Sequence, residues 1–101
     1  MKNFGYKVSL TKKSGDFGAD LILKRNGKIT LVQAKRYKNK VGVGAIQEVV
    51  AAKAMYKADS LIVATNNFFT KAAWELAKAN HVYLVDRNGL IKIKQEIKEK
   101  N

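Results

Sequence analysis

A carboxylate, an amide and an amine with complementary chemistry lie in the first third of the chain, at Asp20, Gln33 and Lys35. The carboxylate of Asp20 and the side-chain carbonyl of Gln33 are hard oxygen ligands, and the backbone carbonyl of Ala34 can add a third. Oxygen ligands of low total charge favour Mg²⁺ or Mn²⁺ over zinc. Lys35 could orient or deprotonate a water that attacks phosphorus, or stabilise the charge that develops there. The residue types therefore indicate metal-assisted phosphodiester hydrolysis.

These side chains can meet only if the chain reverses sharply between them. Asn26-Gly27 separates two apolar runs, 19–24 and 28–35, and Asn-Gly between such runs is a strong signal for a two-residue β-hairpin turn. This turn places Arg25 opposite Lys28, which fixes the pairing of the two strands.

The same register brings the three polar residues together. It places Asp20 opposite Gln33, with Cβ atoms about 4.5–5.5 Å apart. Lys35 follows Gln33 by two residues, so it lies on the same face. Both faces of the hairpin are apolar enough to predict burial on both sides, where a polar cluster is costly to desolvate and therefore suggests a site. Spacing alone supports an ordinary Asp–Lys ion pair at a strand end equally well.

The remaining elements follow from periodicity and capping signals. We expect strands at 6–11, 60–65 and 82–86 and helices at 43–57 and 70–80, while the segment from residue 90 is ambiguous between a strand and a charged helix. Met55 and Trp74 are core candidates. The order is an N-terminal β-hairpin followed by β-α-β-α-β. We therefore predict an α/β fold with a mixed sheet flanked by helices, antiparallel at first and parallel later.

Composition limits the function classes. The chain has 101 residues and no Cys, which predicts one domain, residues 1–101, without disulfides or thiolate metal sites. No apolar stretch is long enough for a membrane span, and we expect a cytoplasmic protein. Twenty Lys and Arg against eight Asp and Glu give a net charge of +12, which attracts polyanions. Because only three of these cations are Arg, attraction to the phosphate backbone is favoured over base-sequence readout.

Several segments in order give the sequence a family resemblance. They are GDFGAD at 15–20, QAKRY at 33–37, VGAIQE at 43–48, AAKAMYKAD at 51–59 and FTKAA at 69–73. Together they resemble the Mrr-like branch of the PD-(D/E)xK nucleases, from Gly5 to about Ile93. The resemblance implies a restriction-endonuclease-like fold and Mg²⁺-dependent DNA cleavage.

The resemblance also implies roles for individual residues. Asp20 is then the metal-binding Asp, Gln33 occupies the (D/E) position, and Lys35 is the catalytic Lys. Gln33 carries no charge, so metal binding should be weaker than with an acid there. Gln47 is similar to a glutamine that this branch places on the following helix, facing the site, and Asp16 and Glu48 are candidate supporting acids.

The cations nearest these motifs are expected to contact DNA, and Tyr37 could stack on a base or simply pack. This predicted DNA-binding set is Lys12, Lys13, Arg36, Tyr37, Lys38 and Lys40.

One departure from the family pattern lies at the N-terminus. Relatives usually begin with a helix that covers the sheet and often supplies a metal-binding Glu, whereas four residues precede Gly5 here and no acid precedes Asp16. We therefore expect an exposed sheet face that favours a homodimer or a partner chain. One metal ligand is then absent, or comes from elsewhere, such as Glu48 or a second subunit. A non-cleaving nucleic-acid-binding or assembly module with a degenerate nuclease fold is the alternative function.

Overall fold

Five strands and three helices make up the described part of the chain. The computed structural model describes residues 7–10 and 21–100, with side chains from 21 to 98. The elements are β1 (Lys7–Leu10), β2 (Leu21–Arg25), β3 (Lys28–Lys35), α1 (Val43–Tyr56), β4 (Ser60–Thr65), α2 (Lys71–Ala79), β5 (Val82–Val85) and α3 (Arg87–Lys100).

The strands form one mixed sheet in chain order, β1-β2-β3-β4-β5. β2 pairs in antiparallel fashion with both β1 and β3, whereas β4 is parallel to β3 and β5 is parallel to β4. Parallel neighbours need a crossover, and α1 and α2 provide one each. The predicted α/β class, with a sheet that is antiparallel first and parallel later, is confirmed.

The turn that positions β2 against β3 has the predicted form. Asn26 and Gly27 both have positive φ, 52° and 79°, as a two-residue turn of the primed type requires. Arg25 pairs with Lys28 as expected, and the ladder continues to Leu21 opposite Val32. Asp20, the next residue along this ladder, lies outside the described residues.

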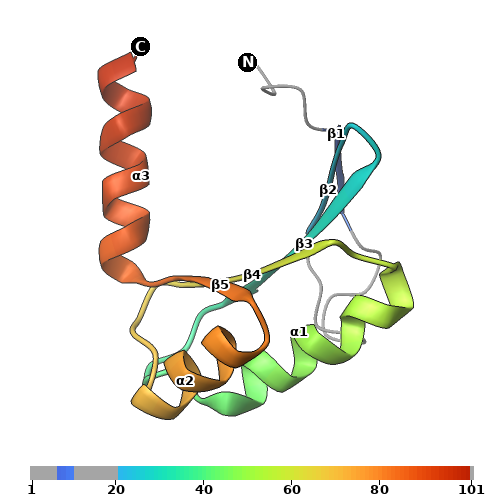
Figure 1. Cartoon of the computed structure of the whole chain (residues 1–101). Helices are drawn as coiled ribbons and strands as arrows, with labels where there is room; N and C mark the ends of the chain where they lie inside the picture. Colours follow the sequence, from blue (N-terminus) through green and yellow to red (C-terminus); the bar gives the residue numbers. More distant parts are fainter. Residues whose placement is uncertain (1–6, 11–20, 101) are drawn as a thin grey trace.

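The core lies on one side of the sheet only. α1 and α2 lie against the same face (Figure 1). Their buried side chains meet those of β3, β4 and β5. The fully buried members of the core are Leu31, Val41, Ile46, Val49, Val63 and Ala73.

The expectation that both faces of the hairpin are buried is wrong. On the other face Leu21, Leu23 and Val32 are only half-buried and Ala34 is exposed, because no described helix lies over them. The assignment of Met55 and Trp74 to the core is also wrong, since these side chains are 58% and 44% exposed.

The ambiguous C-terminal segment is a helix. Asp86 begins it, because its side chain accepts a hydrogen bond from the Gly89 amide at 3.0 Å and its backbone carbonyl accepts one from Leu90 at 2.9 Å. α3 projects to the side of the sheet opposite α1 and α2 (Figure 1). Its apolar residues stay largely uncovered, with Ile93 44% and Ile97 55% exposed.

No helix within the described ranges has the length and apolar character needed to cross a membrane.

Candidate active site

A polar cluster joins the second half of β3 to the middle of α1. Strand periodicity puts Gln33 and Lys35 on the β3 face that α1 covers, and Glu48 reaches them from the helix. The Glu48 Oε1 atom accepts a hydrogen bond from Gln33 Nε2 at 2.8 Å and lies 2.7 Å from Lys35 Nζ. One carboxylate oxygen therefore holds two of the predicted catalytic side chains.

Gln33 is the most deeply placed member of the cluster. Its side chain is only 2% exposed, and its Oε1 atom accepts no hydrogen bond from any described residue. A buried carbonyl without a partner typically costs about 1–3 kcal/mol of stability, and such groups call for a functional explanation. The arrangement leaves a buried, neutral oxygen able to bind a cation or a water.

The ammonium group of Lys35 is held in its charged form. Its side chain is 15% exposed, against 49% for Glu48. Burial lowers the pKa of Lys35, but the hydrogen bond to Glu48 and the interaction with the Tyr37 side chain together raise it above its usual value. The same hydrogen bond to Lys35 lowers the pKa of Glu48, against the opposing effect of burial. Lys35 Nζ also lies 5.6 Å from the centre of the Tyr37 ring, which favours a cation there.

The cluster lies toward the carboxyl ends of the parallel strands, where ligands bind in open α/β sheets. Lys35 ends β3 beside Thr65, which ends β4. Asn67 connects the segments that follow these strands: its Nδ2 donates to the Tyr37 carbonyl at 3.0 Å, and its own carbonyl accepts from the Arg87 amide at 2.8 Å. Hydrogen bonds of Asn67 therefore join the segments that follow the carboxyl ends of β3, β4 and β5.

The predicted site residues are only partly brought together. Gln33, Lys35 and Glu48 are in contact, whereas Gln47 points to solvent and is exposed, as is Ala34. Glu48, predicted only as a supporting acid, makes direct contacts with β3 that the sequence pattern does not indicate.

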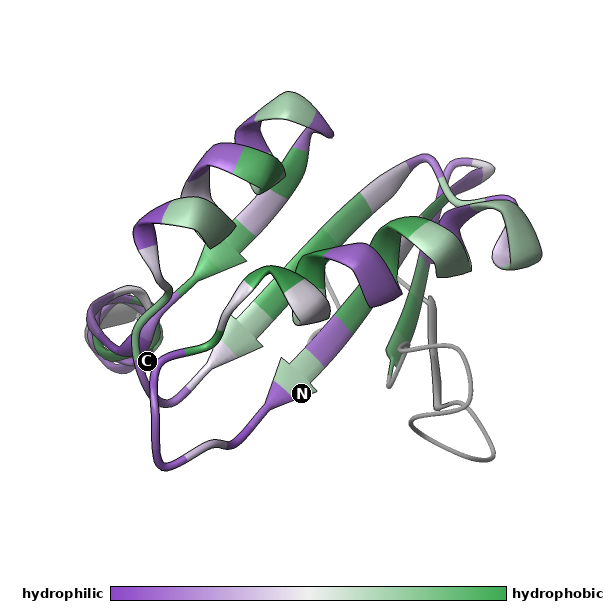
Figure 2. Ribbon diagram, turned by 90° about the horizontal axis from the view of Figure 1, so that it is seen from below, coloured by the Kyte–Doolittle hydropathy of each residue, from purple (hydrophilic) through white to green (hydrophobic). Residues whose placement is uncertain are grey.

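The predicted DNA-binding residues fall into two groups. Arg36, Tyr37, Lys38 and Lys40 are all exposed. They occupy the connection from β3 to α1, much of which is hydrophilic in Figure 2. The other two predicted DNA-binding residues, Lys12 and Lys13, lie outside the described residues, as do the predicted site residues Asp16 and Asp20.

The described donors fit a hard cation in part. Within the part of the chain that the structure describes, no group of three His, Cys, Asp or Glu could hold a metal ion. Gln33 Oε1 is buried and accepts no hydrogen bond from the described residues, and such a carbonyl oxygen suits Mg²⁺ or Mn²⁺.

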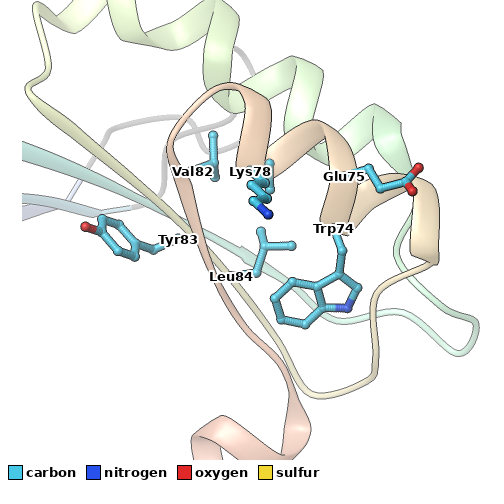
Figure 3. Close-up of a pocket in the computed structure, with 7 residues that line it drawn as sticks. Trp74, Glu75, Lys78, Val82, Tyr83 and Leu84 are labelled. Carbon is cyan, nitrogen blue, oxygen red and sulfur yellow. The ribbon is translucent and has the colours of Figure 1, made fainter.

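A hollow of about 450 Å³ lies elsewhere, between α2 and β5. Its lining includes Trp74, Lys78 and Leu84, with Tyr83 extending away from Trp74 (Figure 3). It is open to solvent, and its two charged residues, Glu75 and Lys78, are exposed. We place the candidate site at the Gln33 cluster, where buried polar groups converge.

Comparisons with known proteins identify the family and the fold of this chain. The family model Mrr_cat, described as restriction endonuclease, matches residues 1–93. A search of curated proteins gave no match. A crystal structure of a protein of unknown function, AF1548, is similar with a TM-score of 0.67 and 15% sequence identity. The match covers 82% of this chain and 50% of that protein, so this chain spans half of its length, and the likeness concerns the fold alone.

Proposed function

Because the chain belongs to the restriction endonuclease family described by the Mrr_cat model, we propose that it is a metal-dependent endonuclease that hydrolyses DNA phosphodiester bonds. The observation that carries this proposal is the buried carbonyl oxygen of Gln33, which accepts no hydrogen bond from the part of the chain that the structure describes, beside a charged Lys35. The restriction-endonuclease-like sheet presents both from one strand. Family membership supports a nuclease, and the Mg²⁺ or Mn²⁺ dependence is our proposal.

The metal would be held by the Asp20 carboxylate, Gln33 Oε1 and the Ala34 backbone carbonyl. The described register ends at Leu21 opposite Val32, and Asp20 would lie opposite Gln33 if the register continued by one pair. When bound, the cation supplies Lewis acidity toward the phosphoryl group. Gln33 contributes a neutral oxygen, which leaves more of the positive charge of the cation available to the phosphodiester.

Lys35 acts on the negative charge that develops at phosphorus. The contact with Glu48 at 2.7 Å favours the ammonium form, which cannot accept a proton from water. Of the two roles open to this residue, stabilisation of developing charge is therefore the better supported. Glu48 and Tyr37 keep Nζ beside Gln33 and limit its rotation.

DNA would approach the carboxyl ends of β3, β4 and β5. The exposed Arg36, Lys38 and Lys40 follow the motif directly and can neutralise phosphates on either side of the cleaved bond. Tyr37 is 46% exposed beside Lys35 and has a ring face available to an unstacked base.

We further propose that a second copy of the chain covers the open face of the sheet. Tyr83, on the outermost strand of that face, is 68% exposed, and the apolar residues of α3 project on the same side. Exposed large apolar side chains on one side of a sheet are typical of interfaces between chains.

The function is tested with supercoiled plasmid, Mg²⁺ or Mn²⁺, and the variant Lys35→Met. Cleavage should fall by about 100- to 1,000-fold, as for loss of one group that stabilises transition-state charge, while DNA binding persists. Lys78→Met removes an exposed Lys on α2 and is the matched control. DNA binding without metal-dependent cleavage by the wild-type protein would favour the non-cleaving module, and loss of activity in both variants would contradict a specific role for Lys35.

A further inference from the structure

Glu48 makes two contacts that meet at a single atom. Its Oε1 atom accepts a hydrogen bond from Gln33 Nε2 at 2.8 Å and lies 2.7 Å from Lys35 Nζ. Both partners come from β3, whereas Glu48 comes from α1, so this acid ties the two β3 side chains to the helix. The three side chains therefore behave as one unit.

The chemistry of this contact decides the orientation of the Gln33 amide. An ionised carboxylate only accepts hydrogen bonds, whereas an amide offers a donor end and an acceptor end of nearly equal shape. Glu48 therefore selects the NH₂ end of Gln33, and the carbonyl oxygen must point the other way. That oxygen is the buried atom that accepts no hydrogen bond from the described residues.

We propose that Glu48 is a positioning residue that fixes the Gln33 amide with its carbonyl oxygen toward the bound divalent cation. This inference rests on the proposed function, because it assigns the cation to that oxygen. It assigns Glu48 a role that acts through the Gln33 amide, because the Glu48 oxygen that faces β3, Oε1, is already engaged by two donors.

A neutral amide at position 48 would remove this selection. In Glu48→Gln the side chain keeps its size, but it can offer either an oxygen or an NH₂ group to Gln33. The Gln33 amide could then turn its NH₂ end toward the cation, and the positive partial charge of this NH₂ group would weaken cation binding. Residues that orient metal ligands typically change metal affinity by about 10- to 100-fold when replaced.

The first measurement is the affinity of the protein for Mn²⁺, by calorimetry in the absence of DNA. Glu48→Gln should weaken binding by about tenfold. Glu75→Gln removes one charge from an exposed Glu on α2 and should leave the affinity close to that of the wild type. An unchanged affinity in Glu48→Gln would overturn the proposal.

A second background separates orientation from simple charge attraction. In Gln33→Glu both ends of the side chain are oxygens, so no orientation has to be selected. Adding Glu48→Gln to Gln33→Glu should then weaken Mn²⁺ binding by about twofold or less. Equal losses in both backgrounds would mean that the charge of Glu48 acts directly on the cation, which contradicts a positioning role.

The side-chain amide of Gln33 gives a readout that needs no metal. In ¹H–¹⁵N spectra, its NH₂ group should show one shifted, slowly exchanging proton that disappears in Gln33→Glu and loses its shift in Glu48→Gln. If the wild-type protein bound no Mn²⁺, the metal dependence of the proposed function would fail. An amide signal unaffected by Glu48→Gln would instead overturn the positioning role by itself.

Discussion

The Oε1 atom of Glu48 on α1 lies 2.7 Å from the Nζ atom of Lys35 on β3, and the same oxygen accepts a hydrogen bond from the buried Gln33. A helix and a strand are thus joined by charge where the rest of their interface is apolar. The free energy of unfolding should therefore depend on the ionisation of Glu48 and Lys35.

The first prediction concerns pH. The folded-state pKa of Glu48 is lowered from its usual 4.5, mainly by the hydrogen bond to Lys35, so its contribution is present above that value and is lost as the pH falls through the folded pKa. The pKa of Lys35 is raised from 10.5 in the folded state, although burial opposes this, so its contribution is present below 10.5 and is lost at higher pH. Urea unfolding should show wild type and Glu48→Gln converging in stability in acid and differing at neutral pH. A difference independent of pH would contradict the ion pair as its source.

The second prediction concerns DNA affinity and salt. Replacing Arg36, Lys38 or Lys40 by Gln should reduce the slope of log affinity against log salt by about 0.9 for each phosphate contact removed. Fluorescence anisotropy with a short duplex measures this slope. Lys53→Gln and Lys57→Gln, at the far end of α1, are matched controls and should leave the slope unchanged. Equal effects from both sets would indicate that net charge matters and that no particular face binds.

The third prediction compares two glycines with open space around them. Gly27→Ala should destabilise the protein by about 1–2 kcal/mol, because φ is +79° at this turn and an L residue is strained there. Gly44→Ala, in the first turn of α1, should instead stabilise it by up to about 1 kcal/mol, since a Cβ atom meets nothing within 4 Å. Denaturant titration measures both changes, and effects of the same sign would contradict the assigned turn.

The fourth prediction concerns assembly. Light scattering should give the mass of a dimer, and Tyr83→Lys should shift the protein toward a monomer by placing a charge on the open sheet face. Met55→Lys is the control, because Met55 is 58% exposed on α1, in the layer on the other side of the sheet. A wild-type monomer would exclude the proposed homodimer.

The hairpin was predictable because its signal is local. Asn26-Gly27 allows positive φ at two successive positions, and this alone fixes which residues of β2 and β3 face each other. Helix α2 was predictable for a similar reason, since Thr70 accepts a hydrogen bond from the Ala73 amide at 3.1 Å and sets the first turn.

The orientation of α1 could not be read in the same way. Apolar residues occur around most of its circumference, so the pattern does not show which side meets the sheet. A stripe centred between Ile46 and Val50 brings Gln47 near the site. The buried residues are Ala45, Ile46, Val49 and Ala52, whereas Val50 is only partly buried, so the buried stripe is displaced toward Ala45. This displacement leaves Gln47 exposed and brings Glu48 alongside β3.

Asn67 has a consequence for how the length of this chain can vary among relatives. One side chain and its backbone hold the connections after β3, β4 and β5 together through Tyr37 and Arg87. A residue inserted into any of these connections would displace the other two, so insertions there should be rare. The Asn26-Gly27 tip makes no such tie within the described residues, and extra residues should accumulate at that end of the sheet instead.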